Sequence, residues 1–212
     1  MKPLKYDPYN LIITGIGGQG NVMASRLIGA MLSLLGYKIT IGETFGASQR
    51  GGSVRSDIRI SSETALSPQI PKGKAHMIVA MEPAEAVRVL GDLGNPEVKV
   101  ICNMRPIHSV NVICGDFEYP TAEQHKQWIT ELSRQAWFVN STEEAVKLGN
   151  PIFGNIMLIG ALAGTGDLPL ERDLFQTVIS QRLPADKVDI NLAAFDIGRA
   201  MTAVEEAADD KR

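Results

Sequence analysis

The sequence predicts an α/β fold: a Rossmann-like, doubly wound and mostly parallel sheet followed by a helical C-terminal section. Short apolar runs alternate with stretches of helical periodicity through the first two thirds of the chain. A glycine-rich turn joins the first apolar run to the first helical stretch. The last third shows only helical patterns. We therefore expect a single domain over residues 1–212, with the sheet in about 9–140 and helices in about 141–208.

The N-terminal segment predicts a strand, a turn, a helix and a second strand. Residues 11–13 are apolar and precede the glycines, which indicates a short buried strand. Apolar residues then recur at helical spacing over 21–35, and Gly36 follows as a C-terminal stop. Residues 37–41 form the next expected strand, parallel to the first and joined to it by a right-handed crossover.

The rest of the chain supplies the other expected elements. Residues 54–60 alternate small or apolar residues with charged ones, which predicts a half-exposed strand at or near a sheet edge. Further strands are expected at 75–81, 98–102, 110–114 and 137–139. Helices are expected from Pro83 to near Gly91, over 121–135, from a capping box at 141–144, and over 155–163, 170–183 and 191–208.

Composition narrows the class of protein. The chain has 212 residues, 21 Lys and Arg against 24 Asp and Glu, and a net charge of −3, so we expect no nucleic-acid partner. No apolar run approaches the ~20 residues of a membrane span, and no signal peptide is recognisable, so we expect a cytoplasmic protein without a membrane partner. The two cysteines, Cys102 and Cys114, are expected to be reduced and buried.

Metal chemistry is not expected in this chain. Two cysteines without a CxxC motif cannot supply the four thiolates of an iron–sulfur cluster. His76, His108 and His125 are scattered and lack a second ligand at metal-binding spacing, so no metal site is predicted.

The first candidate site is the loop "GIGGQG", with Gly15, Gly17, Gly18, Gln19 and Gly20 as candidate cofactor-binding residues. Its glycines permit a tight turn, and the helix that follows offers free N–H groups to an anion. A dinucleotide bound here would place its ribose near an acidic residue after the second strand, and Glu43 lies at a suitable distance along the chain. The pattern leaves three readings open: a dinucleotide site, another phosphate site, or a turn without a ligand.

The second candidate site is the loop "SQRGGS" at 48–53, with Gln49, Arg50, Gly51, Gly52 and Ser53 as candidate ligands. Backbone amides beside glycines and a guanidinium can converge on one anion, although a surface ion pair above a turn would give the same pattern. Both loops follow predicted parallel strands, so we expect them at the same carboxyl edge of the sheet.

Polar residues outside the two loops receive smaller roles. Asn103-Met104-Arg105 follows a later strand and could reach the same edge. Asn155 and Asn191 are expected to be helix caps or buried amide partners.

The segments "GIGGQGNVMASRLIGAMLSLLGY" and "ETFGASQRGGSVRSDIRIS" together resemble the gamma-type domain of 2-oxoacid:ferredoxin oxidoreductases. "QRGGSV" favours the indolepyruvate branch, in which this domain is the small (beta) subunit. The C-terminal segments "NIMLIGALAG" and "NLAAFDIGRAM" are similar to the closing helices of that family. The resemblance covers most of the chain, although residues 85–150 are not distinctive.

The resemblance implies a role in the CoA-dependent oxidative decarboxylation of indolepyruvate or another aryl pyruvate, with reduction of ferredoxin. It implies that thiamine diphosphate, Mg²⁺ and [4Fe-4S] clusters belong to a large (alpha) partner subunit that passes electrons to ferredoxin, in an alpha2beta2 assembly. It also implies that this chain alone binds no cofactor and that CoA is a co-substrate. Arg50 and Glu43 are the candidate catalytic residues. The alternative is an NAD(P)-binding Rossmann dehydrogenase or reductase.

Overall fold

The computed structural model describes residues 2–46, 51–108 and 110–203. Six strands form one sheet in the order β2-β3-β1-β4-β5-β6. Their bounds are β1 Tyr9–Ile16, β2 Lys38–Phe45, β3 Ser53–Ser61, β4 Met77–Ala80, β5 Lys99–Asn103 and β6 Gln135–Val139. The strands β1, β4, β5 and β6 pair in parallel, while β3 is antiparallel to both β1 and β2. The predicted α/β fold with a mostly parallel sheet is confirmed.

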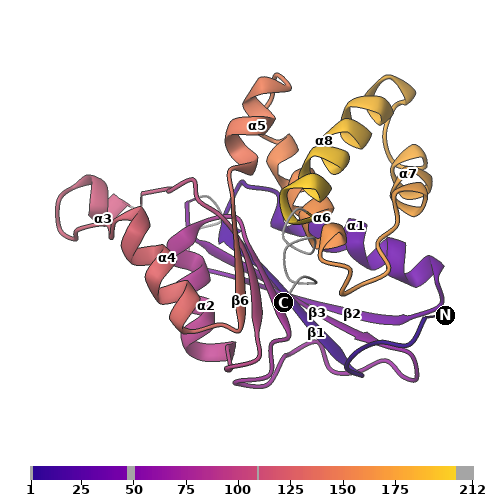
Figure 1. Ribbon diagram of the computed structural model, residues 1–212, viewed down its shortest axis with the longest axis horizontal. Helices are drawn as coiled ribbons and strands as arrows, with labels where there is room; N and C mark the ends of the chain where they lie inside the picture. Colours follow the sequence, from indigo (N-terminus) through magenta and orange to yellow (C-terminus); the bar gives the residue numbers. More distant parts are fainter. Residues whose placement is uncertain (1, 47–50, 109, 204–212) are drawn as a thin grey trace, which may run out of the picture.

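Helices cover both faces of the sheet (Figure 1). One face packs against α1 (Asn21–Leu34), α6 (Phe153–Gly164), α7 (Arg172–Ser180) and α8 (Ala185–Ala203) in the larger apolar cluster. The other face packs against α2 (Pro83–Leu93) and α4 (Ala122–Glu131) in a smaller one. Successive side chains of a strand point to opposite faces, so Leu11 and Ile13 enter the first cluster while Ile12 enters the second. Two short helices, α3 (Val110–Ile113) and α5 (Ser141–Lys147), complete the chain.

The N-terminal strands are arranged differently from the prediction. β1 and β2 run in the same direction, as expected, but β3 lies between them, and Val54 is opposite both Gly15 of β1 and Phe45 of β2. The short connection between β2 and β3 makes them an antiparallel hairpin, and β3 completes the sheet by pairing with β1. β3 is second from the edge and mostly buried rather than half-exposed.

Three local predictions were wrong in detail. Residues 110–113 form the helix α3 and not a strand, and no strand among the described residues pairs with them. α4 ends at Glu131, and Gln135 already belongs to β6. The predicted capping box at 141–144 is absent, because Asn140 is the N-cap and makes no side-chain bond there, whereas Thr121 and Gln124 form a capping box at α4.

The C-terminal helices pack closely through glycines. A Cβ atom on Gly198 of α8 would lie 1.9 Å from the carbonyl oxygen of Met157 in α6, and one on Gly160 would lie 2.0 Å from the carbonyl oxygen of Phe195. Since α6 is buried between α8 and the sheet, its N-terminal turn is held beside the start of α1. This packing places Asn155 next to Gly20.

Candidate functional site

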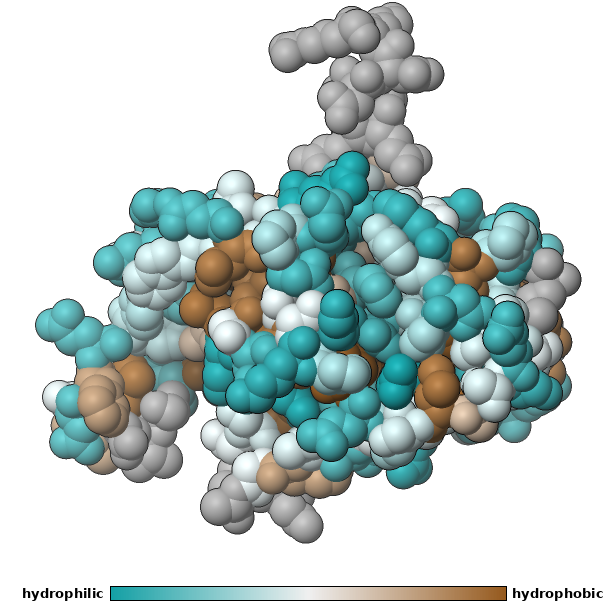
Figure 2. Space-filling view, turned by 90° about the horizontal axis from the view of Figure 1, so that it is seen from below, coloured by the Kyte–Doolittle hydropathy of each residue, from teal (hydrophilic) through white to brown (hydrophobic). Residues whose placement is uncertain are grey.

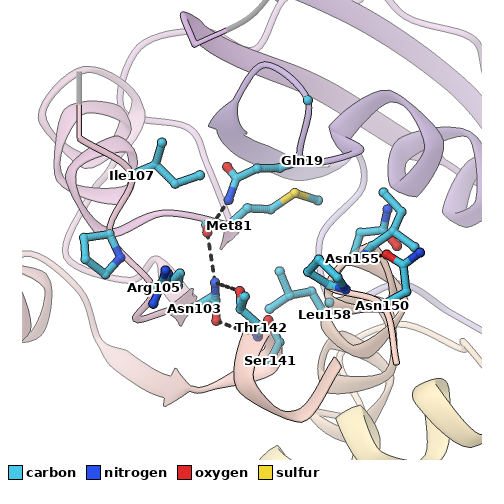
Figure 3. Close-up of a pocket in the computed structure, with 15 residues that line it drawn as sticks. Gln19, Met81, Asn103, Arg105, Ile107, Ser141, Thr142, Asn150, Asn155 and Leu158 are labelled. Carbon is cyan, nitrogen blue, oxygen red and sulfur yellow. Dashed lines mark hydrogen bonds between the residues drawn. The ribbon is translucent and has the colours of Figure 1, made fainter. Parts of the chain in front are cut away.

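A cavity of about 590 Å³ lies at the carboxyl edge of the parallel strands, where open α/β sheets bind ligands (Figure 3). The glycine loop after β1, the ends of β4 and β5, and the first turns of α5 and α6 enclose it. The lining residues are Gly18, Gln19, Met81, Asn103, Arg105, Pro106, Ile107, Ser141, Thr142, Asn150, Pro151, Ile152, Gly154, Asn155 and Leu158.

The glycine loop is braced by its own glutamine. Gly18 and Gly20 have φ angles of 107° and 91°, in the left-handed region that favours glycine. The backbone N–H of Ile16 donates to Oε1 of Gln19 over 2.7 Å, and Nε2 of Gln19 donates to the carbonyl of Met81 over 3.0 Å. Gln19 therefore ties the loop to the end of β4, and its amide is already engaged within the protein.

The two glycine-rich loops contact each other directly, at the sheet edge where the sequence predicted them. The N–H of Gly17 donates to the carbonyl of Gly52 over 2.8 Å, and the N–H of Gly51 donates to the carbonyl of Gly17 over 3.4 Å. The hydroxyl of Ser53 donates to Oε1 of Glu85 in α2 over 2.5 Å. The amides of Gly17 and Gly51 thus hold the two loops together, and the Ser53 hydroxyl ties the second loop to α2.

The other residues that the sequence predicted for the site do not all lie at the cavity or within the described residues. Gln49 and Arg50 lie outside the described residues. Gly15 packs tightly, since a Cβ atom there would meet Oε1 of Gln19 at 2.6 Å. Glu43 lies in β2, two strands from β1, and is 3.9 Å from the guanidinium of Arg26. Because neighbouring strands are about 4.8 Å apart, Glu43 is roughly 10 Å from the strand that carries the glycine loop.

Asn155 has no hydrogen-bond partner for either amide atom among the described residues, although its side chain is buried. Its Nδ2 lies 2.2 Å from where a Cβ atom of Gly20 would be. The residue is therefore neither the cap nor the paired buried amide that the sequence predicted. The hydroxyl of Ser141, buried on the same cavity wall, also lacks a partner within the described part of the chain. Buried polar atoms are normally paired, so these three atoms indicate a polar ligand.

A second buried asparagine in the cavity is fully engaged. Nδ2 of Asn103 donates to the carbonyl of Met81 over 3.1 Å and to the hydroxyl of Thr142 over 3.0 Å, and its Oδ1 accepts from the backbone N–H of Thr142 over 3.4 Å (Figure 3). Asn103 thus connects β4, β5 and α5 at the cavity floor. Arg105 follows it and supplies a positive charge at the wall, as the sequence suggested.

A buried carboxylate next to the cavity sets the electrostatics of this edge. Glu82 caps α2 by accepting from the backbone N–H of Glu85 over 2.9 Å, and it also accepts from the hydroxyl of Tyr119. Burial and this carboxylate raise the pKa of Tyr119 above its ordinary value. Burial raises the pKa of the Cys102 thiol, and the charge of Glu82 raises it further, so this cysteine stays protonated and is no nucleophile. Cys114 is exposed, contrary to the expectation that both cysteines are buried.

A second cavity of about 760 Å³ adjoins the first between α1, α6 and α8. Its walls are mostly apolar, and three cationic side chains also line it: Arg26, Arg182 and Lys187. Asn155 lines both cavities. An elongated ligand with apolar, amide and anionic parts would match the apolar walls, the Asn155 amide and the cationic side chains of these two cavities.

The described ranges contain neither a metal-binding cluster nor a membrane-spanning helix. No group of three or more His, Cys, Asp or Glu side chains is placed to hold a metal ion. None of the helices between residues 2 and 203 that the structure describes is long and apolar enough to cross a bilayer.

A family model and several curated proteins match most of this chain. A family model described as "Pyruvate ferredoxin/flavodoxin oxidoreductase" matches residues 10–201. "Indolepyruvate oxidoreductase subunit IorB" of Pyrococcus horikoshii is 38% identical over 191 residues, which cover 90% of this chain and 94% of the relative. The subunit of the same name from Thermococcus kodakarensis is 37% identical with the same coverage.

Solved structures share the fold at low identity. The gamma subunit of a keto/oxoacid ferredoxin oxidoreductase from Geobacter sulfurreducens matches with a TM-score of 0.65 and 18% identity, over 92% of this chain and 99% of that one. A 2-oxoglutarate:ferredoxin oxidoreductase from Magnetococcus marinus, with 2-oxoglutarate, coenzyme A and succinyl-CoA bound, matches with a TM-score of 0.73 and 18% identity. That match covers 94% of this chain and 32% of the other chain.

Proposed function

Because this chain belongs to the pyruvate ferredoxin/flavodoxin oxidoreductase family, we propose that it is the small subunit of an indolepyruvate ferredoxin oxidoreductase. The observation that carries the proposal is the family match over residues 10–201 together with 33–38% identity to IorB subunits of four archaea. The reaction breaks the bond between the carbonyl carbon and the carboxylate of an aryl 2-oxoacid and releases carbon dioxide. A thioester to CoA forms, the thiol proton is released, and two electrons pass to ferredoxin.

In this proposal the redox and thiamine chemistry belongs to a larger partner subunit. Two cysteines in the whole chain do not fit a four-thiolate cluster, and one of them, Cys102, is buried with a raised pKa. We therefore assign the [4Fe-4S] clusters, thiamine diphosphate and Mg²⁺ to the partner, which also contacts ferredoxin. An alpha2beta2 assembly is the expected stoichiometry. A cytoplasmic location agrees with the two free thiols.

This chain would contribute part of the CoA site. Asn155 offers an amide donor and an acceptor that have no partner among the described residues, and these match the amides of a pantetheine chain. Arg105 at one cavity, and Arg26, Arg182 and Lys187 at the other, could meet the anionic end. In the Magnetococcus marinus enzyme, coenzyme A is among the bound molecules, which supports CoA as the ligand class.

The glycine loops would form the rim of this site. Gly17, Gly18, Gln19 and Gly20 set the shape of the first loop. Gly51 and Gly52 hold the second loop against it, and Ser53 ties the second loop to Glu85 of α2. Gln49 and Arg50 remain candidate contacts to CoA or to the substrate carboxylate. The paired loop amides leave fewer free donors for a pyrophosphate than a dinucleotide site would use.

Affinity purification of the tagged chain from its native cells tests the proposal. We expect a larger partner to copurify, with bound thiamine diphosphate and the visible absorption of iron–sulfur clusters. The competing NAD(P)-dependent dehydrogenase predicts instead that the isolated chain binds NADH. Micromolar NADH binding in a fluorescence titration, with no such partner, would overturn the proposal in favour of the dehydrogenase.

A further inference from the structure

The segment over residues 110–119, named here the α3 arm, projects from the body of the molecule. Figure 1 shows α3 beyond the helices α2 and α4, and Figure 2 shows the same end as a projecting lobe with apolar side chains on its surface. Ile113 is 73% exposed and Phe117 is 65% exposed, the two highest values among the large apolar side chains of the described residues. Two large apolar side chains exposed to this degree within one short projecting segment indicate an interaction surface.

The base of the α3 arm is fixed to the sheet edge. The hydroxyl of Tyr119 donates to Glu82, and the backbone N–H of Ile107, just before the arm, donates to Oε1 of the same carboxylate over 3.4 Å. The ring of Tyr119 packs between His108 and His125, at centroid distances of 4.9 and 5.0 Å. Ile107, before the arm, and Tyr119, its last residue, thus both bond one buried carboxylate at the sheet edge.

We propose that the α3 arm docks into the larger subunit of the enzyme, an inference that rests on the proposed function. Asp116 and Glu118 flank Phe117, and the chain carries no Lys or Arg between Arg105 and Lys126. The complementary surface on the partner is therefore an apolar recess with a cationic rim. Phe117 and Ile113 fill the recess, and the two carboxylates meet the rim.

The position of the arm also points to this partner. Arg105 and Ile107, at its base, line the cavity assigned to CoA. A subunit docked on the arm would meet this chain beside the cavity, where its cofactors have to reach the substrate. The same fold forms 32% of a longer chain in the Magnetococcus marinus enzyme, whereas the IorB relatives are named as subunits and match over 94% of their length. A separate subunit needs a non-covalent contact to hold that position.

The natural cysteines provide the test. Cys114 lies in the α3 arm and is exposed, while Cys102 is buried in β5 and serves as the internal control. N-ethylmaleimide labelling followed by mass spectrometry is compared between the isolated chain and the purified complex. We expect Cys114 to react readily in the isolated chain and at least about tenfold more slowly in the complex, with Cys102 unreactive in both. An equal rate for Cys114 in the two states overturns the proposal.

Matched variants measure the contribution of the arm to affinity. Ile113→Ser with Phe117→Ser is compared with Leu34→Ser with Val146→Ser, a pair that is 56% and 58% exposed on other helices. We expect the arm pair to weaken binding of the larger subunit about 30-fold or more, and the control pair to change it less than about threefold. Equal effects of the two pairs would overturn the docking site.

Two outcomes separate this inference from the proposed function. If wild-type chain and larger subunit form an active complex in which Cys114 stays reactive, the docking site is wrong and the function stands. If no larger subunit binds the wild-type chain, the proposed function fails, and the docking inference fails with it. Protection of Cys114 that grows with the concentration of the isolated chain would identify a second copy as the occupant and overturn the assigned partner.

Discussion

Replacing Asn155 with leucine separates ligand binding from stability at the cavity. Leucine has nearly the shape of asparagine and no polar atoms, so the variant removes two buried amide atoms that have no partner among the described residues. In the isolated chain this change removes the free-energy cost of burying those two amide atoms. In the active complex it deletes a donor and an acceptor for the ligand.

The structure sets the size of both effects. An unpaired buried polar group costs about 1–3 kcal/mol, so the free energy of unfolding of the isolated chain should stay unchanged or rise within that range. For a chain of this size, each kcal/mol corresponds to about 2–4 °C in Tm. Two lost ligand hydrogen bonds cost about 1–3 kcal/mol in all, which lowers kcat/KM for CoA by about 5- to 150-fold.

Asn103→Leu is the matched control, because Asn103 is a buried asparagine in the same cavity whose amide bonds Met81 and Thr142. Its replacement unpairs those groups and should lower the free energy of unfolding by about 1–3 kcal/mol. Thermal unfolding of the isolated chains and steady-state kinetics of the complexes, with CoA and the 2-oxoacid varied separately, give the comparison. The assignment of Asn155 to the CoA site is refuted if Asn155→Leu destabilises the chain as much as Asn103→Leu does and leaves the KM for CoA unchanged.

Two further predictions concern stability. Gly198→Ala places a Cβ atom 1.9 Å from the Met157 carbonyl oxygen, so it should lower the free energy of unfolding in urea by more than about 2 kcal/mol. Gly91→Ala, whose Cβ atom meets nothing within 4 Å, is the control and should be neutral or stabilising. Similar losses for both variants would contradict the α6–α8 packing. Burial lowers the pKa of His76 below its ordinary 6.5, and its Nδ1 accepts from the N–H of Asn10. As the pH falls, the imidazole is therefore protonated in the unfolded chain before it is protonated in the folded chain, so stability should fall as the pH drops below about 6.5. His76→Phe should reduce this pH dependence of Tm, and an unchanged Tm profile would contradict the prediction.

The sequence predicted the fold class and the edge of the sheet that carries the site, because both follow from local patterns. The glycines after β1 and the periodicity of α1 are readable within one window of sequence. The place of β3 between β1 and β2 cannot be read from one window of sequence, since strand order depends on pairing between distant segments. Residues 110–113 show the same limit: the β-branched residue types in this segment favour a strand, but no strand in the described part of the chain pairs with it.

The residues that best indicate a ligand were missed for a related reason. Asn155 and Ser141 are far from the glycine loop in sequence and reach it only through the packing of α5 and α6 at the sheet edge. One signal was present: Asn155 is the single polar side chain in "FGNIMLIGALAG", a helix that is otherwise apolar on all sides. Such a residue in a fully buried helix needs a partner. The structure supplies none for it among the described residues.

The rate of ferredoxin reduction by the reconstituted enzyme tests directly whether this chain is a required subunit of an indolepyruvate ferredoxin oxidoreductase. The larger subunit, loaded with its cofactors, is assayed anaerobically with indolepyruvate and CoA, with and without this chain. We predict reduction of ferredoxin and formation of the aryl-acetyl-CoA thioester only when both subunits and CoA are present. Equal activity of the larger subunit without this chain would show that the chain is not a required subunit of the enzyme.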